Sequence, residues 1–249
     1  MSSVKALVLC GGEGKRLRPI TYYIQKTMIP IGYNQRPLLE YVVRLLKFHG
    51  INDINLLVGY KAEQIQNYFN DGTKFDVEIS YIHDSQTLGG NGGAVINAYQ
   101  EGGFDENDLL LVYYGDILTN VNLTQLISFS KDRKATATVA LASSFEVRVG
   151  VAEIEEDGKI RGFIEKPKLE KPVSIGLLAL KGKAFGEARR LIRDKTSLDL
   201  MGDVLPYLIA KGERVYGYVS DAFWYDVGST EAYEKLNSKR VKEAFSFLP

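Results

Sequence analysis

The sequence has little of the chemistry on which many catalytic centres depend. Its 249 residues include one cysteine, Cys10, and two histidines, His49 and His83. A single cysteine excludes an internal disulfide and is typical of a reducing compartment. The two histidines lie in unrelated contexts, so the sequence offers no His/Cys metal cluster. Cys10 ends an apolar run, which favours a small buried side chain over a reactive thiol.

The sequence also has no excess of charge and no long apolar run. The 31 basic and 31 acidic residues cancel, so there is no global attraction for nucleic acid or for an anionic membrane. No apolar run approaches about 18 residues, and the N-terminus lacks the apolar core of a signal peptide. We therefore expect a cytoplasmic protein that binds neither nucleic acid nor membrane, with any attraction for anions confined to a local site.

Short apolar runs alternate with amphipathic stretches through the first half of the chain. This alternation predicts an α/β fold with a Rossmann-like, mixed and mostly parallel sheet flanked by helices. Strands are expected at residues 4–10, 54–60, 75–82 and 108–116, and helices at 37–50, 61–70, 93–100 and 123–131. After about residue 134 strands dominate, with a turn at 155–159 and helices near 183–194, 203–211 and 229–240.

The stretch LCGGEGKRLRPIT (9–21) places three glycines beside Lys15, Arg16 and Arg18. A Walker A loop would need Ser or Thr after Gly14-Lys15, and a dinucleotide fingerprint would need glycine where Leu17 stands. What remains is a glycine-rich turn after the first strand, where open α/β sheets bind ligands. Bare backbone and arginine together suit a phosphate; the alternative is a tight turn with solvated charges.

The longer string GGEGKRLRPIT…KTMIPI resembles the nucleotide-binding signature of the sugar-1-phosphate nucleotidylyltransferases. Further segments match that family in order over roughly residues 4–230: QRPLLEYVV, LGGNGGA, YYGDIL, VGVAEI, FIEKP, SIGLLAL, DVLPYLI and FWYDVGS. The resemblance implies one nucleotidyltransferase domain over residues 1–249, with a glycosyltransferase-A-like fold. A nucleotide-binding half would cover about 1–133 and a sugar-binding half about 134–249, without the C-terminal β-helix domain that many members carry.

The resemblance also implies a reaction and roles for its residues. Family members join a nucleoside triphosphate to a sugar 1-phosphate with Mg²⁺, giving a nucleotide sugar and pyrophosphate. Arg16 matches the arginine that grips the triphosphate, and Lys26 the lysine near the attacking sugar phosphate. Asp116 and Asp226 match the two metal-binding aspartates, which together with phosphate oxygens and water suit Mg²⁺. These four are the expected catalytic residues.

The remaining expected contacts divide between nucleotide and sugar phosphate. The nucleotide site is expected to comprise Leu9, Gly11, Gly12, Gly14, Lys15, Arg16, Asp84 and Gly89. The sugar-phosphate site is expected to comprise Gly150, Glu165, Lys166 and Gly176. The cluster LGGNGGA (88–94) corresponds to a family loop beside the base and ribose, and Thr27 stands where the family has proline.

The identity of the base and sugar depends on one residue. An ionised Asp84 accepts hydrogen bonds only, which suits the N1–H and amino donors of guanine, or the amino group of cytosine, better than the edge of uracil or thymine. This favours GTP with mannose 1-phosphate; the alternative is UTP or dTTP with glucose 1-phosphate. An alternative of another class is an inactive regulatory subunit, which would be expected to lose Arg16, Asp116 or Asp226. A homo-oligomer remains open, and it would form through the catalytic core itself.

Overall fold

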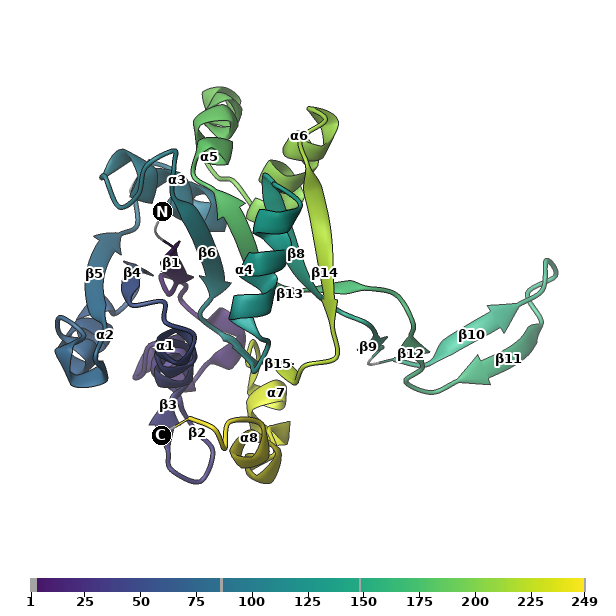
Figure 1. The fold of residues 1–249 in the computed structure, drawn as a ribbon. Coiled ribbons are helices and arrows are strands. Elements are labelled where there is room, and N and C mark those ends of the chain that lie inside the picture. The colour runs from purple at the N-terminus through teal and green to yellow at the C-terminus, as the bar shows by residue number, and fades with distance from the viewer. Residues whose placement is uncertain (1–3, 86, 148, 249) are drawn as a thin grey trace.

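The computed structural model describes residues 4–85, 87–147 and 149–248, and its centre is a seven-stranded sheet (Figure 1). The strand order is β14 (Val215–Ser220), β8 (Ala137–Ala142), β13 (Val173–Lys181), β6 (Leu109–Tyr114), β1 (Val4–Leu9), β4 (Asp53–Val58) and β5 (Glu78–His83). Only β13 runs antiparallel to its neighbours, β6 and β8; the other four pairs in this sheet are parallel. The predicted mixed, mostly parallel sheet is confirmed, and strands from both halves of the sequence form it.

Helices cover both faces of the sheet. The α-helices of the described residues are α1 (Leu38–Phe48), α2 (Ala62–Phe69), α3 (Gly90–Gln100), α4 (Leu123–Asp132), α5 (Lys183–Ala188), α6 (Leu205–Ala210), α7 (Thr230–Lys235) and α8 (Ser238–Ala244). Successive strand residues point to opposite faces: Ala6 and Val8 pack with α1, α2 and α4, whereas Leu7 packs with α3, α5 and α6. Among the described residues, no helix has the length and apolarity needed to cross a membrane.

Several expected elements begin or end elsewhere for local reasons. The expected helix at 229–240 is two helices, because Leu236 is extended and the Asn237 side chain caps a new helix at Lys239 and Arg240. The expected helix at 183–194 becomes a 3₁₀ helix from Arg189. The expected strand at 75–82 starts only at Glu78, since Asp76 has a positive φ of 53°.

Short elements complete the fold around the sheet. Two small antiparallel pairs are β2 (Pro30–Ile31) with β3 (Arg36–Pro37), and β7 (Ile117–Thr119) with β15 (Trp224–Asp226). 3₁₀ turns occur at Lys15–Leu17, Ile20–Tyr22, Lys26–Met28 and Thr73–Phe75, and a π-helical turn at Leu200–Val204. Another two pairs build a projection from the body (Figure 1): β9 (Phe145–Glu146) with β12 (Lys168–Leu169), and β10 (Val151–Ile154) with β11 (Ile160–Ile164). Residues 149–171 of this projection are called the arm below.

Candidate active site

The glycine-rich loop leaves β1 and turns back over the carboxyl end of the sheet. A Cβ on Gly12 would meet no atom within 4 Å, so its backbone is open on that side. Gly14 has a positive φ of 64°, and a Cβ there would lie 2.8 Å from Thr21 Cγ2. The Thr21 hydroxyl donates a hydrogen bond to the Gly14 carbonyl at 2.9 Å. The following turn buries Leu17 and leaves Lys15 and Arg16 exposed, as a loop that receives an anion requires.

Gly11 serves a different purpose from Gly12. A Cβ on Gly11 would lie 1.9 Å from Asp84 Oδ2, and one on Gly59 would lie 2.3 Å from the same oxygen. The Asp84 carboxyl group therefore rests against bare backbone from two loops. Partial burial there raises the pKa of Asp84, and the nearby His83 opposes this shift. The missing side chain of Gly11 makes room for a carboxyl group of the protein as well as for backbone.

The two aspartates expected to bind metal are brought together by strand pairing. Asp116 follows β6 in the turn before β7, and Gly115 N donates to Leu9 O at 3.0 Å. In the β7–β15 pair, Asp226 is the partner of Ile117, and Val227 N donates to Asp116 O at 3.1 Å. Two residues that lie 110 positions apart in the sequence thus become neighbours along the backbone.

The Arg16 guanidinium group and the Asp226 carboxylate both lie close to Gly228. A Cβ on Gly228 would lie 2.6 Å from Asp226 Oδ1 and 3.2 Å from an Arg16 guanidinium nitrogen. Thr230 Oγ1 also donates to Arg16 O at 3.3 Å, which ties the loop to the start of α7. The structure therefore brings Arg16, Asp116 and Asp226 into one region, and their assignment as catalytic residues stays a prediction. The glycine leaves the space between the guanidinium and the carboxylate open.

Lys26 contacts Asp116, and the buried side chain of Gln25 fixes the turn that carries Lys26. Its ammonium group donates to Asp116 Oδ2, and its side chain is only 13% exposed. The preceding Gln25 is fully buried and donates to Cys10 O at 2.5 Å. Gln25 Oε1 accepts from both the backbone N–H and the hydroxyl of Thr27, at 2.6 and 2.7 Å. Thr27, which replaces the family proline, thus supplies two donors that fix the turn carrying Lys26.

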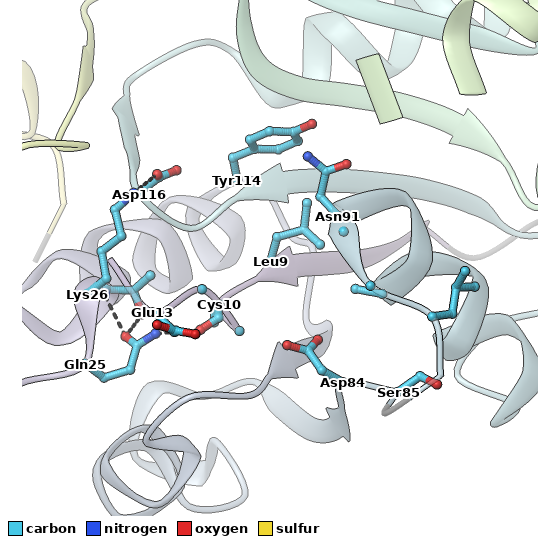
Figure 2. A pocket seen from close by; sticks show the side chains of 17 residues that line it. Leu9, Cys10, Glu13, Gln25, Lys26, Asp84, Ser85, Asn91, Tyr114 and Asp116 are labelled. Carbon is cyan, nitrogen blue, oxygen red and sulfur yellow. Dashed lines mark hydrogen bonds and ion pairs between the residues drawn. The ribbon is translucent and has the colours of Figure 1, made fainter. Parts of the chain in front are cut away.

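A cavity is bordered by Lys26, Asp116 and Asp84. It has a volume of about 470 Å³ and is lined by Leu9, Cys10, Gly11, Gly12, Glu13, Gln25, Lys26, Thr27, Asp84, Ser85, Leu88, Gly89, Gly90, Asn91, Ala94, Tyr114 and Asp116. Figure 2 shows Lys26 and Asp116 at one end and Asp84 and Ser85 at the other. A second hollow of about 360 Å³ shares Glu13 and Lys26 with it and is completed by Gly14, Lys15, Arg16 and Gly228. A partly open cleft of this size, mostly apolar with charged groups at its ends, fits a nucleotide with its phosphates at the Lys26 end.

The glycine cluster at 88–94 is a helix start and not a loop. Gly89 is the N-cap of α3, and Gly90 has a positive φ of 80°. A Cβ on Gly90 would lie 2.2 Å from Leu198 O, so the glycines admit the backbone of residues 196–198. Asn91 fastens this packing: its amide donates to Asp199 Oδ2 at 2.8 Å and its oxygen accepts from Leu200 N at 2.6 Å. The space left by the missing side chains of these glycines is occupied by residues 196–198.

The expected sugar-side residues are not all in one place. Gly176, with a positive φ of 72°, interrupts the β13 register, and a Cβ there would lie 3.1 Å from Tyr114 of the cavity wall. Gly150, Glu165 and Lys166 belong to the arm and are not among the residues that line the cavity. A Cβ on Gly150 would lie 2.8 Å from Glu165 Oε2, so these two residues contact each other.

Several cavity residues were not anticipated from the sequence. Asn91 and Tyr114 lie within segments that match the family, LGGNGGA and YYGDIL, but no role was predicted for them or for Gln25. The Tyr114 hydroxyl is buried, and burial together with Asp199 and Asp116 raises its pKa. Burial also raises the pKa of the Cys10 thiol. Cys10 is therefore a protonated, buried side chain, which agrees with the interpretation that it is a small hydrophobe.

Comparison with known proteins identifies the family. Residues 5–243 match the model of the nucleotidyl transferase family. The chain is 33% identical over 246 residues to a UTP–glucose-1-phosphate uridylyltransferase of Synechocystis, covering 92% of this chain and 61% of that protein. It is 28% identical to a mannose-1-phosphate guanylyltransferase of Mycobacterium tuberculosis, covering 96% of this chain and 65% of that protein. The chain thus belongs to the nucleotidyl transferase family, among the sugar-1-phosphate nucleotidylyltransferases.

Solved structures agree with the fold. A structure described as a putative glucose-1-phosphate thymidylyltransferase from Bacillus anthracis, in complex with sucrose, matches with a TM-score of 0.73 at 24% identity, covering 94% of this chain and 97% of that one. HddC from Yersinia pseudotuberculosis, complexed with GMP-PN, matches with a TM-score of 0.71 at 23% identity, covering 95% of this chain and 99% of that one. The curated relatives are longer, and the chain spans about three fifths to two thirds of their length.

Proposed function

We propose that this chain transfers a nucleotidyl group from a nucleoside triphosphate to a sugar 1-phosphate and releases pyrophosphate. The observation that carries the proposal is the grouping of four charged residues: Lys26 and Asp116 line the nucleotide-sized cavity, Arg16 lines the adjoining hollow with Lys26, and strand pairing brings Asp226 beside them. Cations that contact phosphates and carboxylates that suit a divalent cation are both required when two polyanions react. The match of residues 5–243 to the family supports the same reaction class.

The chemistry needs positioning more than proton transfer. The second pKa of a phosphate monoester is near 6, so a sugar 1-phosphate is largely dianionic at neutral pH and needs no general base. One of its oxygens attacks the α-phosphorus in line. A new P–O bond forms while the bond to the β-phosphate bridging oxygen breaks, and pyrophosphate leaves with that electron pair. This agrees with a cavity whose described lining includes no histidine.

Each charged residue has a part in that step. Arg16 binds the triphosphate and stabilises the leaving pyrophosphate through paired N–H donors. Lys26 holds the attacking phosphate beside Asp116. The backbone of Gly12 lets phosphate oxygens approach the loop, with Gly11 and Gly14 shaping the turn and Lys15 adding charge. Leu9 and Gly89 complete the nucleotide site. Gly176, against Tyr114 of the cavity wall, would contact the sugar phosphate, and so would Gly150, Glu165 and Lys166 if the arm that carries them approaches the cavity.

Asp116 and Asp226 fit a bound Mg²⁺. Carboxylate oxygens are its preferred protein ligands, and it keeps several water or phosphate ligands. The described residues contain no group of three or more His, Cys, Asp or Glu side chains placed to hold a metal, so substrate phosphates would complete the shell. When bound, Mg²⁺ would neutralise charge on the phosphate oxygens. The two aspartates hold and orient it, and Arg16 lies beside them.

The base and sugar are proposed from Asp84. An ionised carboxylate there accepts hydrogen bonds from N1–H and the amino group of guanine, which favours GTP with mannose 1-phosphate. The relative from Synechocystis, named for UTP and glucose 1-phosphate, supports the second candidate, a uridylyl- or thymidylyltransferase acting on glucose 1-phosphate.

Pyrophosphate release tests both candidates together. The protein is incubated with Mg²⁺ and each pair drawn from GTP, UTP, dTTP, CTP and ATP against mannose, glucose, galactose and N-acetylglucosamine 1-phosphates. We expect the largest rate with GTP and mannose 1-phosphate. A largest rate with UTP or dTTP and glucose 1-phosphate would overturn the Asp84 argument and keep the reaction class. No release with any pair would favour the inactive regulatory subunit.

A further inference from the structure

A hollow between α5, α6 and the start of β8 is rich in basic side chains. It has a volume of about 530 Å³, slightly larger than the candidate nucleotide cavity, and is called the distal hollow. Its lining includes the basic residues Lys183, Arg189 and Lys211 and the acidic residues Glu106 and Glu213. The whole chain has equal numbers of acidic and basic residues, so the excess of positive charge is a local feature of this hollow, as an anion site requires.

The distal hollow lies at the other end of the sheet from the candidate active site. β13 runs between the two sites: Gly176 lies against Tyr114 of the nucleotide cavity, and Lys181 ends the strand beside Thr136 of the distal hollow. The extended chain from Gly176 to Lys181 spans roughly 17 Å. In Figure 1, α5 and α6 lie at the end of the sheet opposite to β15, which carries Asp226. The two sites are therefore separate.

Backbone hydrogen bonds hold basic residues of three elements side by side at this end of the sheet. Lys181 N donates to Thr136 O at 3.0 Å, and Thr136 N donates to Arg214 O at 2.8 Å. Lys183 begins α5, and its N–H donates to Glu106 O at 3.1 Å. The sheet and the turn before β6 therefore fix the backbone from which these basic side chains extend.

The positive charge at the distal hollow is only partly compensated. Among the residues that the structure describes, four basic side chains in or beside the hollow form no ion pair within 4 Å: Lys181, Lys183, Lys211 and Arg214. Burial and the neighbouring charges of Lys183 and Arg214 lower the pKa of Lys181, and Glu213 opposes this shift. An anion bound here would relieve the repulsion between these cations.

The two carboxylates of the distal hollow accept hydrogen bonds from hydroxyl groups. Glu213 Oε2 accepts from the Thr136 hydroxyl at 2.5 Å, and Glu106 Oε1 accepts from the Tyr99 hydroxyl at 3.1 Å. A carboxylate has about four acceptor positions, so each can accept from further hydroxyl donors. Tyr207, which also lines the hollow, offers an aromatic surface to the C–H groups of a sugar ring. Cations, carboxylate acceptors and an aromatic ring together suit a ligand that carries both phosphate and hydroxyl groups.

We propose that the distal hollow binds a phosphorylated carbohydrate, with the phosphate group among Lys183, Arg189 and Lys211. The hydroxyl groups of the ligand donate to the remaining acceptor positions of Glu106 and Glu213. Because the hollow lies at the other end of the sheet from the aspartate pair, this ligand is bound without being consumed in the proposed reaction. The site is therefore additional to the sites for the triphosphate and the sugar 1-phosphate.

Calorimetric titration with glucose 6-phosphate, inorganic phosphate and glucose tests the class of ligand. Glucose 6-phosphate is a suitable probe because its phosphate is not at C1, so it cannot react as a sugar 1-phosphate. At an ionic strength of about 0.15 M, it should bind about tenfold or more tightly than inorganic phosphate, since only it also offers hydroxyl donors. Glucose alone should give no measurable heat. No binding of glucose 6-phosphate, or equal affinity for inorganic phosphate, would overturn the proposal.

Removal of two cations tests the place of binding. Lys183→Met/Lys211→Met should weaken the binding of glucose 6-phosphate about tenfold or more, because two charge-assisted contacts to the phosphate are lost. Lys131→Met is the control, since Lys131 is an exposed lysine at the end of α4 and is not part of the hollow. Unchanged affinity in the double variant, or an equal loss in the control, would contradict binding at the distal hollow.

A variant at Gly186 fills the distal hollow and keeps every charge. Gly186 lies inside α5, where glycine is an unfavourable residue, and a Cβ there would lie 3.0 Å from Glu106 Oε1. Gly186→Leu should therefore stay folded, which thermal unfolding checks, and should lose measurable binding of glucose 6-phosphate because the side chain occupies the hollow. Binding retained at wild-type affinity would mean that the probe attaches to surface charges alone, and would refute the site.

Arg16→Ala separates this inference from the proposed function. Arg16 belongs to the candidate active site, so its loss should leave the affinity for glucose 6-phosphate at the wild-type value while pyrophosphate release falls. Binding that depends on Lys183 and Lys211, in a protein that releases no pyrophosphate, would sustain the distal site and refute the enzyme. Loss of glucose 6-phosphate binding in Arg16→Ala would place the probe in the candidate active site and refute the distal site.

Discussion

The ammonium group of Lys26 donates a hydrogen bond to Asp116 Oδ2, at the point where the chain has brought Asp116 beside Asp226. The two proposed roles of these residues, phosphate binding and metal binding, are therefore coupled before any substrate arrives. A divalent cation bound at Asp116 would compete with Lys26 for the same carboxylate oxygen, and would leave the ammonium group free to bind phosphate.

Lys26→Met tests this coupling. Loss of the ammonium group removes a competitor for Asp116, so Mn²⁺ used as a spectroscopic probe should bind the free protein more tightly than it binds wild type. Turnover should nevertheless fall by about two orders of magnitude, because a cation at the reacting phosphates is lost. Titration of Mn²⁺ by electron paramagnetic resonance gives the first quantity, and pyrophosphate release the second. Unchanged metal affinity together with near-normal turnover would remove Lys26 from the site.

Gly11→Ala should lower the stability of the protein, whereas Gly12→Ala should weaken its binding of the triphosphate. The Cβ of Gly11→Ala would overlap Asp84 Oδ2, so we expect the free energy of unfolding to fall by about 1–3 kcal/mol. The Cβ of Gly12→Ala meets nothing within 4 Å, so stability should be retained while the KM for the triphosphate rises. Urea unfolding and initial rates measure the two effects. Restored stability in Gly11→Ala/Asp84→Ala would confirm the source of the clash, and equal stability losses in both glycine variants would contradict it.

Nucleotide binding should depend on the protonation of Asp84. Partial burial raises the pKa of this carboxyl group, so it loses its charge at a higher pH than an ordinary aspartate. If the carboxylate accepts the donors of guanine, the affinity for GTP should weaken as pH falls through that raised pKa. Calorimetric titration between about pH 4 and pH 7 should show this fall in wild type and a flatter profile in Asp84→Asn. Identical profiles would exclude Asp84 from base recognition.

The aspartate pair predicts a specific magnesium phenotype. Asp226→Asn should raise the Mg²⁺ concentration for half-maximal turnover by about tenfold or more, because a neutral amide is a poorer ligand than a carboxylate. Asp221→Asn is the matched control, since the Asp221 carboxylate accepts from Ser143 Oγ at 2.5 Å, whereas Asp226 lies in the strand that pairs with the segment after Asp116. A shift of equal size in both variants would mean that the effect is not specific to Asp226.

The sequence predicts the strands of the first half and the glycine-rich turn after β1 well, because both follow from local patterns; phosphate binding by that turn stays a prediction. Alternating apolar runs define the strands, and glycines followed by cations define the loop at residues 11–16. The neighbourhood of Asp116 and Asp226 depends on the pairing of β7 with β15, which no spacing in the sequence reveals; there the family resemblance supplied the pair. Gln25 and Asn91 were not anticipated for the same reason, since their partners lie on other segments.

The errors also have physical causes. The cluster at 88–94 was expected to be a loop because it corresponds to a loop of the family, but α3 begins at Gly90, residues 196–198 pack against it and Asn91 fixes the contact. The division of residues 229–240 into two helices depends on a capping bond from Asn237, which competes with the helical pattern around it.

The most direct test of the account compares Arg16→Ala with Arg18→Ala in Mg²⁺-dependent pyrophosphate release. Arg16 meets the Asp226 carboxylate at Gly228, whereas Arg18, two residues away, donates to Glu13 at 3.3 Å and stacks on Tyr22. We predict that Arg16→Ala stays folded and loses turnover by about two to three orders of magnitude, while Arg18→Ala keeps most of it. Near-normal turnover in Arg16→Ala would contradict nucleotidyl transfer at this loop.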